Sequence, residues 1–151
     1  MQEYRRRIVQ GVLAEQAANS ILCLGESASA LLPAELAHTY LDTRRWLQDP
    51  HFNERHDLAL FLPDTGMHSE EVQHLLVAAR DLLARRVLAF LPEPAQVATP
   101  SPYIALGYQR LARLAHDESA WIFAIHSYKS TPDWLNSRYW AHPENFDRHR
   151  W

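Results

Sequence analysis

The segment from residue 57 to residue 91 constrains the fold most, because it has the pattern of a strand, a helix and a second strand in succession. Asp57–Leu62 and Val87–Leu91 are short apolar runs, and a proline follows each of them. Between these runs, apolar side chains recur at helical spacing from Val72 to Leu83. Continuous apolar strands are typical of a parallel sheet that is covered on both faces. The unit therefore predicts a right-handed βαβ crossover within an α/β domain.

Capping and charge predict where the helix of this unit begins and ends. Ser69 is a candidate N-cap, and Glu70 and Glu71 follow it in the first turn, where the helix dipole favours negative charge. Arg85 and Arg86 fall in the expected last turn, where positive charge is favoured. The helix is therefore expected to end just before the second strand.

The segments before residue 57 are expected to add further elements to the same domain. In chain order we expect a helix at 3–18, a strand at 20–25, a short helix at 30–36, a strand at 38–42 and a helical turn at 44–48. The strand at 20–25 is apolar and ends in glycine, as strands buried on both faces do.

The segments after residue 91 predict a change from parallel to antiparallel pairing. A proline-rich loop at 93–102 precedes a helical turn at 103–106 that ends at Gly107. Tyr108–Leu114 fits either a strand or a helix, and a hairpin through 116–119 would join it to a last strand at 121–128. The predicted fold class is α/β: a three-layer Rossmann-like sandwich with a mostly parallel sheet and an antiparallel C-terminal strand.

The chain is expected to form one domain over residues 1–151, with an α/β core at 1–128 and an ordered, aromatic-rich segment at 129–151. This segment carries five large aromatic side chains, which disordered tails seldom do. It either covers an exposed sheet face or edge, or contributes to a binding surface. The residues of that second candidate site are Trp134, Asn136, Trp140 and His142.

Composition excludes several classes of function. A net charge of −3 gives no electrostatic reason to expect binding to nucleic acid or to an anionic membrane. The chain has no apolar run long enough to span a membrane and begins without an apolar signal core, so we expect a cytoplasmic protein. The single cysteine, Cys23, excludes an intrachain disulfide and a thiolate-rich zinc site. The nine histidines show no metal-binding spacing, so no metal is expected.

The order of these elements resembles the class I S-adenosylmethionine-dependent methyltransferase core over roughly residues 20–128. The features that carry the resemblance are the glycine-ended first strand, the second strand ending at Asp42, the strand that begins at Asp57 and the Gly107-Tyr108 step before the terminal strand. The ending from Pro132 to Pro143 also resembles a family of uncharacterised small bacterial proteins with this type of core. The resemblance implies a cofactor site beside the first strand, formed by Gly25, Glu26, Ser27, Asp42 and Asp64.

The sequence departs from the methyltransferase signature at positions that contact the cofactor. Cys23 stands where the family has an acidic residue, and Ser27 and Ser29 replace the second and third glycines. Glycines at these positions let the backbone approach a cofactor closely. We therefore expect a non-catalytic domain that acts through protein contacts or a small ligand, with no cofactor bound tightly. The alternative is a working methyltransferase that uses S-adenosylmethionine.

Simpler roles exist for three of the candidate residues. In its simpler role, Gly25 turns the chain at a strand end and does not contact a ligand. Asp42 can cap a helix that begins at residue 43 rather than hold a ribose. Asp64, next to Pro63 and close to Gly66, has the sequence context of a turn as well as that of a ligand site.

Overall fold

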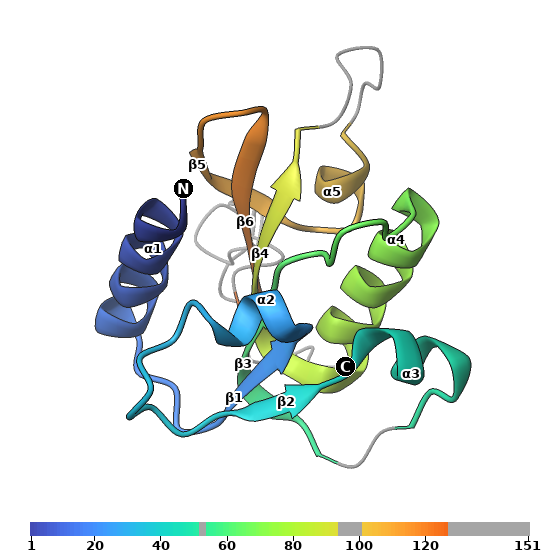
Figure 1. Cartoon of the computed structure of the whole chain (residues 1–151), viewed down its shortest axis with the longest axis horizontal. Coiled ribbons are helices and arrows are strands. Elements are labelled where there is room, and N and C mark those ends of the chain that lie inside the picture. Colours follow the sequence, from blue (N-terminus) through green and yellow to red (C-terminus); the bar gives the residue numbers. More distant parts are fainter. Residues whose placement is uncertain (52–53, 94–100, 127–151) are drawn as a thin grey trace, which may run out of the picture.

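One mixed sheet of six strands forms the centre of the part of the protein that the structure describes (Figure 1). The computed structural model describes residues 1–51, 54–93 and 101–126. The strands are β1 (Ile21–Leu24), β2 (Thr39–Leu41), β3 (His56–Phe61), β4 (Ala84–Pro92), β5 (Gln109–Arg113) and β6 (Glu118–Ala124). Their order in the sheet is β2-β1-β3-β4-β6-β5. The first four in this order are parallel, whereas β6 is antiparallel to both of its neighbours. The predicted α/β class and the antiparallel C-terminal strand are confirmed.

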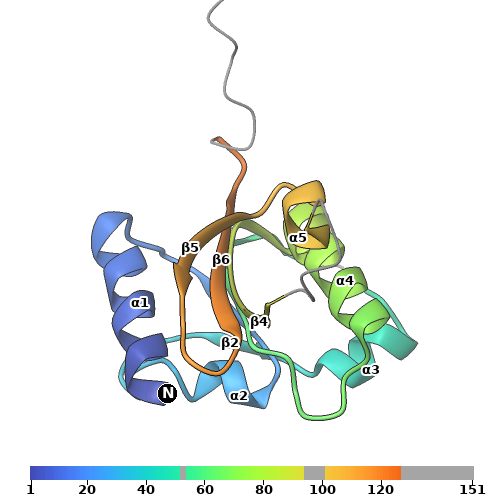
Figure 2. The same cartoon turned by 90° about the horizontal axis from the view of Figure 1, so that it is seen from above.

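Helices cover both faces of the sheet (Figure 2). The helices are α1 (Gln2–Glu15), α2 (Glu26–Ser29), α3 (Thr43–Gln48), α4 (Ser69–Ala78) and α5 (Pro102–Ala105). One apolar cluster joins α1 and α2 to Cys23 and Leu60 of the sheet. The other joins α3, α4 and α5 to Leu22 and Phe61, on the opposite face. Because successive strand residues point to opposite faces, burial on both sides requires the unbroken apolar runs seen in the sequence. None of the helices in the described ranges is long and apolar enough to cross a membrane.

The predicted βαβ unit is confirmed, but its helix begins and ends differently from expectation. His68, not Ser69, is the N-cap, because Oε2 of Glu71 accepts a 2.8 Å hydrogen bond from the backbone N–H of His68. The carboxylate thus satisfies a backbone donor at the helix start from the third helical position, as in a capping box.

The C-terminal end of this helix was predicted wrongly at Arg85 and Arg86. The helix passes into a π-helical turn at Ala79–Leu83, and both arginines lie in β4. Arg86 is only 5% exposed, and its Nη2 donates to the carbonyls of Gln16 (2.9 Å) and Ala17 (3.3 Å). These carbonyls follow the C-terminus of α1, so a distant contact holds Arg86 in the strand.

The prediction of a short helix at 30–36 is also wrong. The helix in this region is α2, which begins directly after Gly25, where the backbone adopts a φ of +90°. Pro33 lies within the expected range, and proline disfavours helical geometry in the residue before it. The neighbouring predictions are confirmed, because β2 lies within 38–42, α3 covers 44–48, and the expected 3–18 helix is present but ends at Glu15.

The predicted C-terminal hairpin is confirmed, and Tyr108–Leu114 proves to contain a strand, β5. Its turn contains His116 and Asp117, which both have positive φ. The last strand begins three residues earlier than predicted, at Glu118, and ends at Ala124. Antiparallel pairing with β4 recruits Glu118 and Ser119 into the strand despite their polarity.

Candidate functional site

The parallel strands β1 and β3 lie side by side and mark the point where the chain changes direction across the sheet. After β1, the chain passes through α2 to β2; after β3, it passes through α4 to β4, on the opposite face and toward the opposite edge. In open α/β sheets, ligands bind outside the carboxyl ends of the strands at such a switch point. The loops that follow Leu24 and Phe61 are therefore the candidate site.

A crevice of about 580 Å³ lies at this point; we call it the switch-point crevice. It is lined by Gln2, Arg5, Glu26, Ser27, Ala30, Tyr40, Asp42, Arg44, Leu62, Asp64 and Thr65. Four of the five cofactor-site residues predicted from the sequence are among them. The fifth, Gly25, lies directly against Asp64. The fold thus brings together three segments that lie far apart in the sequence.

The carboxylate of Asp64 takes the space that glycine leaves at position 25. A Cβ on Gly25 would lie 3.0 Å from Oδ2 and 3.2 Å from Oδ1 of Asp64. Two hydroxyls hold this carboxylate: Ser27 Oγ donates to Oδ1 at 3.4 Å, and Thr43 Oγ1 donates to Oδ2 at 3.3 Å. The group that lies close to the backbone of Gly25 is therefore the carboxylate of Asp64.

Asp42 caps α3, as the simpler of its two predicted roles required. Its Oδ1 accepts a 3.1 Å hydrogen bond from the backbone N–H of Arg45, and its side chain is exposed at the crevice. A carboxylate has about four acceptor positions, so capping leaves acceptors available to a ligand. Capping and ligand binding are therefore compatible at Asp42.

The electrostatic field of the crevice is negative. Partial burial, and then the charges of Asp42, Asp64 and Glu26, raise the pKa of Tyr40 above its ordinary value. Of the two arginines in the lining, Arg5 forms an ion pair with Glu118 at 2.5 Å, which lies outside the crevice lining. The other, Arg44, donates to the carbonyl of Thr65 at 3.3 Å. The three carboxylates therefore outnumber the two guanidinium groups, one of which is already paired outside the crevice, and this balance favours a cationic ligand or side chain.

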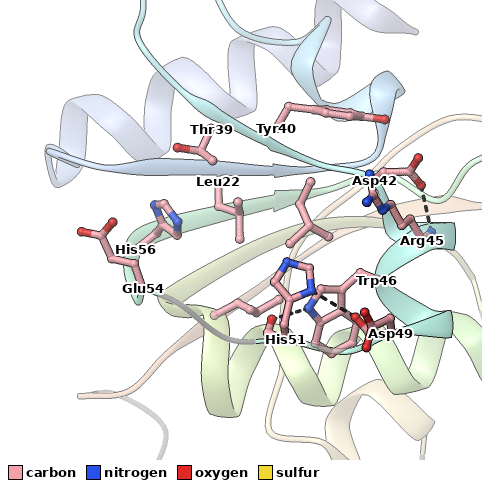
Figure 3. Close-up of a pocket in the computed structure, with 12 residues that line it drawn as sticks. Leu22, Thr39, Tyr40, Asp42, Arg45, Trp46, Asp49, His51, Glu54 and His56 are labelled. Carbon is pink, nitrogen blue, oxygen red and sulfur yellow. Dashed lines mark hydrogen bonds between the residues drawn. The ribbon is translucent and has the colours of Figure 1, made fainter.

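A second cavity, of about 760 Å³, lies beside β2, shares Tyr40 and Asp42 with the switch-point crevice and was not predicted from the sequence; we call it the edge cavity (Figure 3). Its lining comprises Leu22, Thr39, Tyr40, Leu41, Asp42, Arg45, Trp46, Asp49, His51, Glu54, His56 and Leu83. Figure 3 shows Trp46 and His51 together at one side, with His56 and Glu54 at the other end. Two histidines that looked scattered in the sequence thus line one cavity.

Two hydrogen bonds order the wall of the edge cavity. Trp46 Nε1 donates to the carbonyl of His51 at 2.8 Å, and His51 Nδ1 donates to the carbonyl of Asp49 at 3.0 Å. His56 differs from these residues, because its Nδ1 is buried and has no hydrogen-bond partner among the described residues. The sequence offered one signal for His56, its position directly before an apolar run, but β3 begins one residue earlier than predicted and includes it.

Two other polar groups have structural roles. Burial raises the pKa of Cys23 to about 12, so the thiol stays protonated and unreactive. Asp57 links the start of β3 to the segment before β1, because its Oδ2 accepts hydrogen bonds from the backbone N–H groups of Asn19 and Ser20. Within residues 1–51, 54–93 and 101–126, no group of three or more histidine, cysteine or acidic side chains is arranged to hold a metal ion.

The second candidate site from the sequence, formed by Trp134, Asn136, Trp140 and His142, lies outside the described residues, as does the whole 129–151 segment.

Comparison with known proteins places the chain in a family without assigning it an activity. A search of curated proteins gives no match. The model of a family of unknown function, DUF6231, matches residues 3–151. Since this match spans nearly the whole chain, the protein belongs to the DUF6231 family.

Proposed function

We propose that this chain is a non-catalytic, methyltransferase-like domain that binds a small ligand or a partner protein at the switch-point crevice. The observation that supports this proposal most strongly is the contact between Asp64 and Gly25. In the methyltransferase signature, glycines after the first strand let the cofactor approach the backbone. Here the carboxylate of Asp64 fills that space, 3.0 Å from where a Cβ would lie.

The residues around Gly25 support weak cofactor binding. The Ser27 and Thr43 hydroxyls hold the Asp64 carboxylate from two sides, so a cofactor must break both hydrogen bonds before it reaches the glycine. The strand-end position that is acidic in the signature is Cys23, which is fully buried and protonated. These residues do not fit S-adenosylmethionine in the manner of the methyltransferase family.

The charge of the crevice supports a cationic ligand or side chain. Glu26, Asp42 and Asp64 line it together, and their combined field acts on Tyr40. A protonated amine or a guanidinium donates hydrogen bonds to such carboxylates, and charge-assisted bonds of this kind are the stronger ones. A partner protein that presents a lysine or an arginine has the same chemistry as a small amine.

The alternative function, a working S-adenosylmethionine-dependent methyltransferase, has one specific observation in its favour. Asp42 directly follows the second strand and lines the crevice, as the ribose-binding acid of that family does, and only one of its oxygens accepts a hydrogen bond from α3. The three-layer Rossmann-like architecture belongs to the same proposal. Helices on both faces of the sheet and a switch point between β1 and β3 support it.

Calorimetric titration with S-adenosylmethionine and S-adenosylhomocysteine distinguishes the two functions. We expect dissociation constants above roughly 100 μM, an affinity too weak for a resident cofactor. Low-micromolar binding that weakens when Asp42→Ala is introduced would contradict the non-catalytic proposal and favour the enzyme.

A further inference from the structure

The edge cavity has an apolar floor and a polar rim. Leu22 and Leu83 of the floor are almost fully buried, and the floor continues to Leu41 and Trp46. Because β2 is the edge strand of the sheet, the cavity opens beside an edge that no other described strand covers. Cavities of several hundred Å³ with apolar walls and a few convergent polar groups are typical small-molecule sites.

His56 supplies a polar atom that lacks a partner at this cavity. The residue is 9% exposed, it lines the cavity, and its buried Nδ1 has no hydrogen bond to any residue in the described part of the chain. A buried polar atom without a partner is unfavourable by the full cost of its desolvation. A ligand with a hydrogen-bonding group at this position would satisfy the atom.

The rim of the cavity selects for positive charge. Asp42, Asp49 and Glu54 supply three carboxylates to the described lining, whereas Arg45 supplies the one guanidinium. One oxygen of Asp42 accepts a hydrogen bond from the N-terminus of α3, whereas Asp49 and Glu54 are exposed. A protonated amine is thus favoured there and a carboxylate is disfavoured.

We propose that the edge cavity is a binding site for a small aryl-alkyl amine, separate from the switch-point crevice. The aromatic body of the ligand packs on Leu22, Leu41 and Leu83. Its ammonium group lies toward Glu54, at the same end of the cavity as His56, and one of its N–H groups donates to Nδ1 of His56. This site goes beyond the proposed function, because its contacts with Glu54 and His56 do not involve Gly25 or Asp64.

Three probes with one aromatic body and different charges test the proposal on the full chain. Tryptamine carries an ammonium, tryptophol a neutral hydroxyl and indole-3-acetate a carboxylate. We expect tryptamine to shift the backbone amide resonances of Leu22, Leu41 and His56 in ¹⁵N-labelled protein. We expect it to bind about tenfold more tightly than indole-3-acetate, with tryptophol between them. Equal affinity for the three, or no shifts up to about 10 mM probe, would overturn the proposal.

The position of the shifts separates this site from the switch-point crevice, which is also acidic. Tryptamine shifts confined to Gly25, Ser27 and Thr65 would place the amine in the crevice and refute the edge-cavity site. They would leave the proposed function intact. Conversely, tight binding of S-adenosylmethionine would contradict the proposed function, but the amide shifts that we expect at Leu22 and Leu41 with tryptamine would stay the same.

Variants at two positions test the polar contacts. Glu54→Gln alters an exposed side chain and is expected to weaken tryptamine binding about threefold while leaving tryptophol binding unchanged. Glu35→Gln, at another exposed carboxylate that does not line the cavity, is the matched control. His56→Phe keeps a ring but removes Nδ1, and we expect about tenfold weaker tryptamine binding. If Glu54→Gln and Glu35→Gln have equal effects, the proposed contact with the ammonium group is wrong.

Discussion

The carboxylate of Asp64 lies against the backbone of Gly25, in the space that a side chain at position 25 would occupy. Gly25 directly follows β1, and Asp64 lies three residues beyond the end of the neighbouring strand β3. The contact links the two loops at the switch point and forms part of the wall of the crevice. It makes glycine necessary at position 25 for a reason internal to the protein.

Replacement of Gly25 by alanine is expected to destabilise the protein by about 2–3 kcal/mol. The backbone at this position has φ of +90° and ψ of 158°, a region that side chains other than glycine strongly disfavour. The new Cβ would also lie tightly against the Asp64 carboxylate, which would have to shift by a few tenths of an ångström. Urea unfolding measures the change in the free energy of unfolding.

Gly11→Ala is the matched control. Gly11 lies in α1, and a Cβ there meets no atom within 4 Å. Alanine is favoured over glycine in a helix by about 0.5–1 kcal/mol, so this variant is expected to be more stable than the parent. A Gly25→Ala variant as stable as Gly11→Ala would show that the conformation at position 25 carries no constraint.

The sheet could be predicted from the sequence because its burial leaves a local signature. Leu60 faces one apolar cluster and Phe61 the other, so the run from Leu58 to Leu62 is apolar at every position. The same rule identified β1, and proline or glycine marked the ends of the runs. The helix end that was predicted wrongly at Arg86 depends on a contact between distant residues. Nothing near Arg86 in the sequence reveals that it donates to the carbonyl of Gln16, 70 residues earlier.

The candidate site could be predicted only in part, for a related reason. Asp64 follows an apolar strand and Asp42 precedes a helix, so the sequence predicted where each residue lies relative to its own strand or helix. Their meeting at one crevice depends on the order β2-β1-β3, which a single sequence does not specify. The edge cavity was missed because its lining comes from several short segments, and because His56 and Trp46 have no shared spacing or motif.

Replacement of Arg86 by leucine is expected to destabilise the protein by about 1–3 kcal/mol. The guanidinium donates to the carbonyls of Gln16 and Ala17 just beyond α1, and without it these acceptors lose their charged donor. Burial lowers the pKa of Arg86, so the bonds it makes have to offset the cost of desolvating its charge. Hydrogen exchange should show faster opening of α1 relative to β3. Unchanged exchange in α1 would mean that Arg86 does not anchor this helix.

Cys23 is expected to resist thiol reagents in the folded protein. Burial raises its pKa to about 12, so the thiolate that reacts is scarce at neutral pH, and the side chain has no exposed surface. Since Cys23 is the single cysteine, labelling by iodoacetamide followed by mass spectrometry reports on it alone. Modification should require unfolding and should follow the unfolding rate as urea is added. Rapid labelling without denaturant would contradict the burial of β1.

The raised pKa of Cys23 also predicts how stability depends on pH. The unfolded thiol ionises near its ordinary pKa of about 8.5, whereas the folded thiol stays protonated up to about pH 12. The contribution is therefore complete below about pH 8.5 and is lost as the pH rises toward 12, at up to about 1.4 kcal/mol per pH unit. Cys23→Ala lacks this group, so its stability should fall less steeply over the same range.

The affinity for S-adenosylhomocysteine of the parent and of Asp64→Ala, measured side by side by calorimetry, tests the central claim most directly. This compound lacks the sulfonium charge, so the comparison reports mainly on space at Gly25. Asp64→Asn, which keeps the shape of the side chain, is the control and should bind as weakly as the parent. We expect a parent dissociation constant above roughly 100 μM and binding at least about tenfold tighter in Asp64→Ala. Low-micromolar binding by the parent that is lost in Asp64→Ala would contradict the account, because Asp64 would then hold the cofactor rather than exclude it.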